Sequence, residues 1–368
     1  MNDNNEKLSV ALIFGGQSSE HDVSCVSASF VANVLDKDKY DITYIGITKK
    51  GHWLLVDDVN EIKDREWEKD PDSRPRAIIS PDTDHQLLIK RDNAYETRKL
   101  DVAIPMLHGL FGEDGTIQGI FEMAHLPYTG CGHLSSAITM DKFFTKVVAD
   151  SINVDQAAYV GVRDYEIRDR KTHEPSAEID RIVEEVESFR DYPVFVKPSC
   201  AGSSMGITKA HNRQELVEGL KIAADNDSKI LVEEAISGRE IECAVFGYGD
   251  NAFAAGVGEI VAAAEFYDFD AKYNNAESLT VIDPELPEGK AQEIMDTALR
   301  IYRACDCFGF ARVDFFLENG TNRVVFNEIN TIPGHTSISM YPMIMEKAGY
   351  PMGVYMDKMI EMAYERHM

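Results

Sequence analysis

The chain has 368 residues, 44% of them hydrophobic, which is enough for a large core and for two or three domains. Its 63 acidic residues outnumber 37 basic ones and give a net charge of −26, a balance that repels nucleic acids and anionic membranes. Because ATP would be repelled as well, a nucleotide site needs lysines or arginines placed inside local motifs.

Residues 1 to about 130 are predicted to alternate strands and helices. Strands are expected at 8–14, 40–48 and 100–107, and helices at 20–36 and 116–125. This alternation favours a parallel sheet, which binds ligands beyond the carboxyl ends of its strands. The charged stretch from about 55 to 98 is interpreted as an insertion or loop without chemistry.

The rest of the chain is predicted to mix strands and helices in smaller units. Asp141 is placed to cap a helix at 141–152, with Phe144, Val147 and Val148 on its buried side. Further elements are expected as strands at 192–197 and 229–234, with a Gly/Ser-rich loop at 199–206, and as helices at 214–226 and 352–366.

Two polar residues stand near strand ends in the first unit. Glu20 follows the Gly15-Gly16 pair near a helix start, where its carboxylate could bind an ammonium group; an acidic residue favoured by the helix dipole is the alternative. His108 ends a strand in the crevice where a ligand is expected, although a lone histidine is usually structural. The glycine pair is not GxGxxG, so a dinucleotide-binding fingerprint is poorly supported.

A loop of small residues, SCAGSSMG at 199–206, follows Lys197. Glycines expose backbone N–H groups that bind phosphate oxygens, and a lysine supplies the countercharge. GxxxxGK[ST] occurs nowhere in the chain, so this is not a Walker loop, and an ordinary turn is the alternative. At the end of the next strand, backbone groups near Glu233 could contact the edge of an adenine ring, and a carboxylate such as that of Glu240 could contact the ribose. An exposed acidic strand end without a ligand is an equally good interpretation.

Two apolar runs at 310–317 and 323–326 flank a polar turn and predict a β-hairpin. The hairpin brings Asp314 close to Glu328 and Asn330, three oxygen donors of the kind that suits magnesium. Arg312 shares a strand face with Asp314, because side chains alternate along a strand. A fixed cation beside a metal can hold charge that develops in a reaction; a solvated hairpin with an ion pair is the alternative.

The six cysteines are scattered through apolar surroundings without a CxxC pair or a zinc spacing. Cys305 and Cys307 form a CxC pair, a pattern more often due to core packing than to metal binding. The chain shows no basic amino-terminal region followed by an apolar stretch, so no signal peptide is expected. No apolar run approaches the length needed to span a membrane. These features favour a reducing, cytoplasmic location.

Four separated segments resemble, in chain order, the D-alanine–D-alanine ligases of the ATP-grasp superfamily. They are GGQSSEHDVS (15–24), HGLFGEDGTIQG (108–119), VKPSCAGSSMGITK (196–209), and ARVDFF with NEINTIPGHTSISMYP (311–316 and 327–342). YTGCG (128–132), MDKFFTK (140–146) and FYDFDAKY (266–273) also fit. The resemblance runs from about residue 9 to the last helix.

The resemblance implies an α/β ATP-grasp fold in three parts. These are an N-terminal Rossmann-like, parallel-sheet domain at 1–130, a central ATP-grasp subdomain at 131–236, and a C-terminal subdomain at 237–368 with a lid loop at about 262–285. The implied reaction turns two D-alanines and ATP into D-alanyl-D-alanine, ADP and phosphate for peptidoglycan precursors. It proceeds through an acyl phosphate and a tetrahedral intermediate, and the implied assembly is a homodimer.

Site roles are implied position by position. ATP binding falls to Lys142, Lys197, Ser204, Glu233, Glu234, Ile236, Glu240, Phe266 and Lys272. The implied catalytic set is Glu20, His108, Ser203, Tyr273, Arg312 and the backbone N–H of Gly334. Glu20 and His108 would also contact the first D-alanine, and Ser339 and Met340 the carboxylate of the second. Asp314, Glu328 and Asn330 would hold two Mg²⁺ or Mn²⁺ ions, in agreement with the hairpin argument.

Tyr273 bears on the choice of the second substrate. In the family, Phe at this position accompanies ligases that accept D-lactate, whereas Tyr, whose hydroxyl can complete a buried hydrogen-bond network, accompanies dipeptide formation. D-alanine is therefore expected as the second substrate. D-serine is the nearest competitor, because Ile338 stands where many members have His; D-serine ligases, however, often carry FFDF where this chain has FYDF at 266–269.

Three other functions remain open. They are an ATP-grasp ligase acting on a different carboxylate, a nucleotide-binding protein without catalysis, and a dehydrogenase. The segments at 15–24 and 266–273 argue against the first, and the missing GxGxxG argues against the third. Retention of Arg312 beside a metal site disfavours the second, since a mere binder needs no such arrangement.

Overall fold

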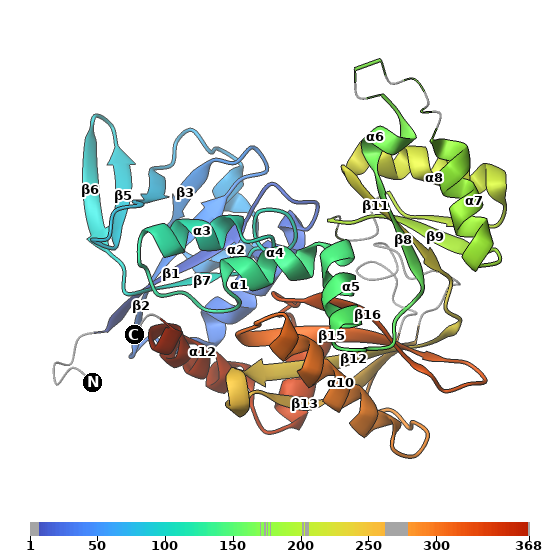
Figure 1. The fold of residues 1–368 in the computed structure, drawn as a ribbon. Coiled ribbons are helices and arrows are strands. Elements are labelled where there is room, and N and C mark those ends of the chain that lie inside the picture. Colours follow the sequence, from blue (N-terminus) through green and yellow to red (C-terminus); the bar gives the residue numbers. More distant parts are fainter. Residues whose placement is uncertain are drawn as a thin grey trace.

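The computed structural model describes residues 7–169, 171–172, 174, 176, 178–200, 202, 206–261 and 279–366. The residues in these ranges form three β-sheets that are arranged with their helices around a shared central region (Figure 1). Strand β1 (Leu8–Gly15) and helix α12 (Met352–Arg366), from opposite ends of the chain, lie on the same side of the molecule. None of the described helices is long and apolar enough to cross a membrane.

The N-terminal sheet has seven strands within the described ranges, in the order β6-β5-β4-β3-β2-β1-β7. The other strands are β2 (Tyr40–Ile47), β3 (Trp53–Val56), β4 (Arg76–Ile79), β5 (Gln86–Arg91), β6 (Ala94–Lys99) and β7 (Val102–Pro105). The helices of this part are α1 (His21–Val34), α2 (Val59–Lys63), η1 (Glu66–Glu68) and α3 (Thr116–Met123). Strand β1 pairs in parallel with β2 and β7, which confirms the parallel sheet predicted there.

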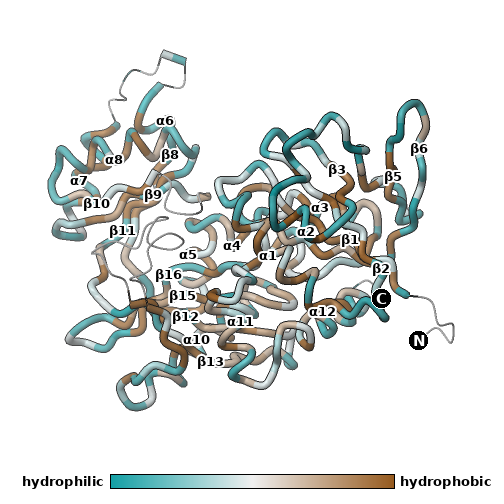
Figure 2. The backbone as a smooth tube through the Cα atoms, turned by 180° about the vertical axis from the view of Figure 1, so that it is seen from behind, coloured by the Kyte–Doolittle hydropathy of each residue, from teal (hydrophilic) through white to brown (hydrophobic). Residues whose placement is uncertain are grey.

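The interpretation of 55–98 as a loop or insertion is wrong. This stretch holds α2, η1 and strands β4 to β6, and β3 to β6 extend the sheet by antiparallel pairing. Apolar residues also occupy exposed positions in these strands, such as Ile78 of β4, which lies between the buried Ala77 and Ile79. A strand of four to six residues with apolar residues on both faces gives almost no period-two signal. Strand β6 buries no side chain, and Figure 2 shows it largely in hydrophilic colour.

The central sheet is antiparallel, with the order β10-β9-β11-β8. Its strands are β8 (Tyr159–Arg163), β9 (Val194–Pro198), β10 (Thr208–Ala210) and β11 (Lys229–Glu234). Its helices are α6 (Asp164–Ile167), α7 (Ile179–Phe189) and α8 (Arg213–Asn226), and the chain reaches this unit through α4 (His133–Met140) and α5 (Lys142–Ser151). The predicted strand–loop–helix–strand order is confirmed here.

Helix α5 begins as predicted, because the Asp141 carboxylate accepts a hydrogen bond from the Phe144 N–H at 3.3 Å. Its predicted buried face is wrong. Phe144 and Val147 are exposed, and the buried residues are Thr145, Lys146 and Ala149. The reason is electrostatic: the Lys146 ammonium is paired with a buried carboxylate, so a charged residue faces inward where an apolar one is normally expected.

The C-terminal sheet has the order β14-β13-β12-β15-β16. Its strands are β12 (Gly238–Gly247), β13 (Phe253–Val261), β14 (Leu279–Ile282), β15 (Gly309–Glu318) and β16 (Val324–Asn330). Besides α12, the helices of this unit are η2 (Gly249–Asn251), α10 (Lys290–Ala304) and α11 (Met340–Lys347). The predicted hairpin is confirmed as β15–β16.

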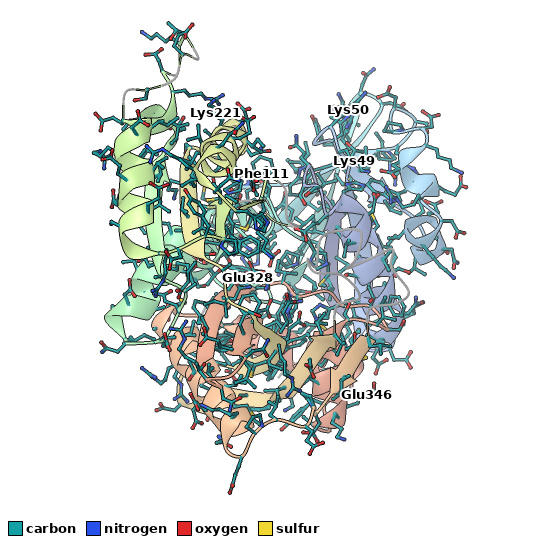
Figure 3. The ribbon with its side chains drawn as sticks, turned by 90° about the vertical axis from the view of Figure 1, so that its right-hand side faces the viewer. Lys49, Lys50, Phe111, Lys221, Glu328 and Glu346 are labelled. Atoms are coloured by element: carbon teal, nitrogen blue, oxygen red, sulfur yellow. The ribbon has the colours of Figure 1, made fainter. Side chains whose placement is uncertain are left out.

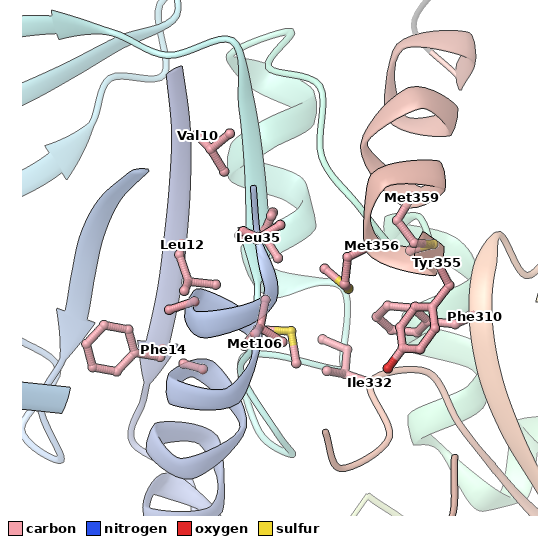
Figure 4. Packing of buried hydrophobic residues seen from close by; sticks show 14 of the residues in the cluster. Val10, Leu12, Phe14, Leu35, Met106, Phe310, Ile332, Tyr355, Met356 and Met359 are labelled. Atoms are coloured by element: carbon pink, nitrogen blue, oxygen red, sulfur yellow. The ribbon is translucent and has the colours of Figure 1, made fainter. Parts of the chain in front are cut away.

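One hydrophobic cluster joins the N-terminal and C-terminal units. It includes Leu12 and Phe14 of β1 together with Phe310, Ile332 and Met359 from the C-terminal unit (Figure 4). Fully buried side chains of this size stabilise a structure by about 1.5–3 kcal/mol each. The two units therefore form a continuous packed body, which holds the loops between them in fixed positions.

Candidate active site

A cavity of about 1480 Å³ lies where the three units meet. Glu20 lines it from the N-terminal unit, Lys197 and Glu233 from the central sheet, and Arg312 and Glu328 from the C-terminal sheet. Figure 3 shows Glu328 in this central region. Side chains from distant parts of the sequence thus reach one space, as the ligand-binding crevice predicted from the strand ends requires.

The β15–β16 hairpin supplies the acidic end of the cavity. Arg312 and Asp314 share one face of β15, and Arg312 donates from two nitrogens to the two carboxylate oxygens, at 2.8 and 2.7 Å. Glu328 lies opposite Asp314 in the register, and Asn330 donates to Asp314 Oδ2 at 2.9 Å. Burial opposes the charge of Arg312, but Asp314 and then Glu242 outweigh it and raise its pKa, so the guanidinium stays cationic.

Asp314, Glu328 and Asn330 present hard oxygen donors that fit Mg²⁺ or Mn²⁺. Within the described ranges, no group of three or more His, Cys, Asp or Glu side chains gathers around a metal position. Two carboxylates and one amide therefore form a partial shell, which suits an ion that completes its coordination with water and phosphate oxygens. Arg312 contacts Asp314, and the Lys142 ammonium lies 3.3 Å from Glu328 Oε2, so both carboxylates contact cations in the present arrangement.

Two lysines, Lys142 and Lys197, line the cavity, and a third, Lys146, is buried beside Glu233. Glu233 is fully enclosed and bridges two of them, with Lys146 Nζ 2.8 Å from Oε1 and Lys197 Nζ 2.5 Å from Oε2. Burial favours the neutral acid, but the two lysines outweigh it and lower the pKa of Glu233 to about 2. Burial also disfavours the charged form of Lys142, yet Glu328 raises its pKa. Lys142 therefore keeps its positive charge, and together with Lys197 it gives the cavity wall a suitable setting for phosphates.

Lys146 was not predicted from the sequence. It is spaced four residues from Lys142 on one helix, and that spacing was the available signal. Glu234, predicted at the ATP site, lines the cavity, but its carboxylate is engaged by the Ala158 N–H at 3.1 Å and by Arg323 at 3.2 Å, and it also pairs with Arg190. Ile236 and Glu240 line the cavity as predicted for neighbours of a nucleotide.

Glu20 lines the cavity between two loops. A Cβ on Gly109 would lie 2.5 Å from Glu20 Oε2, and a Cβ on Gly202 would lie 2.7 Å from the same atom. One glycine belongs to the N-terminal unit and the other to the Gly/Ser-rich loop, so the structure brings both loops to the Glu20 carboxylate.

The loop that carries Gly334 leads into helix α11. A Cβ on Gly334 would lie 2.8 Å from Ser339 Oγ, and Ser339 accepts a hydrogen bond from the Thr336 N–H at 3.1 Å. Met340 begins α11 and its side chain is buried against Gly258, so its backbone N–H is the group that can serve a ligand. Ile338 beside it is 71% exposed.

Ser203, Ser204, Phe266, Lys272 and Tyr273 lie outside the described residues, so their predicted roles stay predictions.

Comparison with known proteins shows the family of the chain. Residues 9–131 match the family model described as the D-ala D-ala ligase N-terminus, and residues 150–361 match that of the C-terminus. The D-alanine–D-alanine ligase of Caldicellulosiruptor bescii is 46% identical over 98% of this chain and 96% of its own length. This chain belongs to the D-alanine–D-alanine ligase family.

Solved structures of the family share the fold. The VanG D-Ala:D-Ser ligase from Enterococcus faecalis aligns with a TM-score of 0.86 at 35% identity, over 97% of this chain and 100% of that one. The D-alanine–D-alanine ligase from Coxiella burnetii aligns with a TM-score of 0.82 at 32% identity, over 98% and 95%. The fold is therefore the mixed α/β ATP-grasp fold of these ligases.

His108 was predicted to contact the first D-alanine, but both of its ring nitrogens are occupied by the protein. Nδ1 donates to the Ile332 carbonyl oxygen at 2.8 Å, and Nε2 accepts from the Ser27 hydroxyl at 2.9 Å. Burial lowers the pKa of His108, although Glu20 opposes this, so the ring is neutral. In this D-alanine–D-alanine ligase family member, His108 lines the cavity and holds the loop that precedes Gly334.

Glu113 holds the same loop and was missed by the sequence analysis. Its Oε1 accepts the Ile332 N–H and its Oε2 accepts the Gly109 N–H, both at 2.8 Å. Burial and then the nearby Glu20 raise the pKa of Glu113 to about 8, although the two N–H donors oppose this. Together Glu113 and His108 fix both backbone polar groups of Ile332, two residues before Gly334.

Replacing Glu113 with glutamine is expected to lower kcat about 10- to 100-fold, because an amide N–H₂ facing a backbone N–H leaves a buried donor unpaired at about 1–3 kcal/mol. The KM for ATP should stay unchanged, since the hydrogen bonds of Glu113 go to Gly109 and Ile332 and not to Lys142 or Lys197. Steady-state kinetics measure both. Asp114→Asn is the matched control, because Asp114 caps the same loop through Phe111 and Thr116 without touching Ile332. Equal losses in both variants would contradict a specific role for Glu113.

Proposed function

We propose that this protein joins two D-alanines into D-alanyl-D-alanine while ATP is converted to ADP and phosphate, and that the dipeptide serves peptidoglycan precursor synthesis. The observation that carries the proposal is one cavity that is lined by the Arg312–Asp314 pair, by Lys142 and Lys197, and by Glu20. Cations for phosphates, oxygen donors for a divalent ion and a carboxylate for an ammonium group are the groups this ligation needs.

In the first step, a carboxylate oxygen of the first D-alanine attacks the γ-phosphorus, the bond to the ADP oxygen breaks, and an acyl phosphate forms. Lys142 and Lys197 supply positive charge for the phosphate oxygens. Glu20 binds the ammonium group of the same D-alanine and so orients its carboxylate. Glu240 and Ile236 border the adenosine.

Asp314, Glu328 and Asn330 would hold the divalent ions, which neutralise charge on the phosphate oxygens during transfer. Arg312 and Lys142 contact these carboxylates in the structure. They would have to share the carboxylates or turn toward the nucleotide when metal and ATP bind.

In the second step, the amine of the second D-alanine attacks the acyl carbonyl carbon, the carbonyl oxygen gains negative charge, and phosphate then leaves. Arg312 and the Gly334 N–H are the donors for that oxygen. Ser339 and the N-terminus of α11, which begins at Met340, suit the carboxylate of the second D-alanine, because the first N–H groups of a helix bind anions.

D-serine is the second candidate for the second substrate. The observation in its favour is the likeness to the VanG D-Ala:D-Ser ligase. Ile338, exposed beside Ser339, is the described residue on this side of the cavity that departs from the family pattern. Curated relatives named D-alanine–D-alanine ligase, at 44–46% identity, support D-alanine instead.

We also propose three domains at 1–130, 131–236 and 237–368. In support, the N-terminal sheet ends at Pro105, the central sheet runs from Tyr159 to Glu234, and the C-terminal sheet begins at Gly238. The protein would act in the cytoplasm, where its substrate ATP is available, and as a homodimer like other family members. Its net charge of −26 supports the absence of nucleic-acid and membrane partners.

In the test, purified protein is incubated with Mg²⁺, ATP and D-alanine, either without a second substrate or with D-serine or D-lactate. Phosphate release is followed, and the products are identified by their masses. Phosphate release that depends on D-alanine, with D-alanyl-D-alanine as the main product, is the expected result. D-alanyl-D-serine as the main product would favour the second candidate. No turnover with any D-amino acid, while L-alanine is equally inert, would refute the proposed function.

A further inference from the structure

His21 follows Glu20 directly and its side chain is fully buried at the start of α1. Both ring nitrogens lie against acceptors: Nδ1 is 2.6 Å from the Gly16 carbonyl oxygen, and Nε2 is 3.1 Å from Oε2 of Glu68. The His21 ring is therefore held on both sides, by the Gly16 carbonyl oxygen and by the Glu68 carboxylate.

Glu68 reaches His21 from a rigid support that the sequence analysis had treated as a loop. It ends helix η1, next to Trp67, whose side chain is fully buried. The Trp67 ring packs so closely on strand β2 that a Cβ on Gly46 would lie 2.6 Å from it. The same ring stacks on His21, with centroids 5.9 Å apart and planes at 21°.

Three further charged groups lie beside the pair: Arg65 just before η1, Lys49 just after β2, and Asp22 on α1. Arg65 contacts Glu68 and lies 2.8 Å from Asp22, and Lys49 lies 3.1 Å from Asp22. Glu68 is thus held by Arg65 as well as by His21, so its carboxylate is fixed beside the buried ring.

The turn before α1 depends on His21 for its shape. Glu20 is the N-cap residue of α1, but its side chain makes no capping hydrogen bond within the described helix. The turn is closed instead by the Glu20 N–H to the Ser18 hydroxyl, at 2.8 Å, and by the His21 ring to Gly16. The Glu20 carboxylate can therefore face the cavity while its backbone is held from behind.

We propose that His21 and Glu68 are positioning residues that set the affinity of the first substrate site, by fixing the turn from which Glu20 meets an ammonium group. This inference rests on the proposed function, in which Glu20 binds the first D-amino acid. It assigns a role to the stretch 55–98, which supplies Glu68 and Trp67 from outside the family motifs.

The test uses Glu68→Gln, which keeps the shape of the side chain and removes its charge. The binding constant of the first site, obtained from initial rates over a wide range of D-alanine concentrations, is expected to weaken about tenfold, the effect of a lost charged hydrogen bond. The second-site constant and the KM for ATP should not change. Glu66→Gln is the matched control, because Glu66 lies on the same helix and pairs only on the surface with Lys69.

A second readout is independent of activity. The chain has two tryptophans, so Trp53→Phe leaves Trp67 as the one fluorophore of this kind. Indole fluorescence depends on the ring stacked against it, so Glu68→Gln, which releases the His21 ring, and His21→Gln, which removes it, should each change the fluorescence of Trp67. If neither variant changes Trp67 fluorescence, the contact between His21 and Glu68 is wrong even if the ligase activity is confirmed. If fluorescence changes but all substrate constants shift together, as for a merely structural residue, the positioning role is wrong.

Discussion

Arg312→Ala is expected to lower kcat about 100- to 1000-fold, the usual loss when a donor to a developing oxyanion is removed. Arg312 is partly buried, remains cationic through Asp314 and Glu242, and lines the cavity together with Glu328. Its guanidinium lies in the cavity, where it can stabilise the negative charge that develops on the tetrahedral oxygen. Phosphate release under saturating ATP and D-alanine measures the loss.

Two further variants separate this role from the ion pair alone. Arg312→Lys keeps one positive charge but lacks the fork that holds both oxygens of Asp314, so it should recover only part of the activity. Arg239→Ala is the matched control, because Arg239 forms the same kind of two-point contact with Glu259 on neighbouring strands and does not line the cavity. Loss of activity in Arg239→Ala as large as in Arg312→Ala would contradict the assignment.

Features encoded by neighbouring residues were predictable from the sequence. The β15–β16 hairpin follows from two apolar runs and a turn, and the contact between Arg312 and Asp314 follows from the period of a strand. The Asp141 cap is likewise local. The assembly of Glu20, Lys197 and Arg312 in one cavity came from the family resemblance, since no local pattern relates such distant segments.

Features that depend on a distant partner were not predictable. Glu113 is one acidic residue in a glycine-rich loop, and its role exists only because Ile332, 219 residues away, presents its N–H there. Lys146 stands on the inner face of a helix, where its burial is tolerable only with Glu233 opposite. His21 depends in the same way on Glu68, within a stretch whose strands are short and carry apolar residues on exposed positions as well as buried ones.

The trio of Lys146, Glu233 and Lys197 is where stability and nucleotide binding meet. The three side chains come from α5, β11 and β9, so they tie the helix to the central sheet beneath the phosphate side of the cavity. A buried pair contributes little net stability compared with apolar packing, but removal of one partner leaves uncompensated charge. Here the removal of the shared carboxylate would leave two ammonium groups facing each other.

Glu233→Gln is therefore expected to destabilise the protein by about 3–5 kcal/mol and to raise the KM for ATP, since both lysines lose their anchor. Because folding lowers the pKa of Glu233 from 4.5 to about 2, its contribution is present above pH 4.5 and is lost as the pH falls toward 2. Denaturant unfolding should thus show a large difference in the free energy of unfolding between variant and wild type at pH 7, and this difference should narrow below pH 4.5. Glu185→Gln removes an exposed partner of Arg181 and should leave the free energy of unfolding unchanged at either pH. A difference that stays constant on acidification would mean that lost packing, not lost charge, explains the effect.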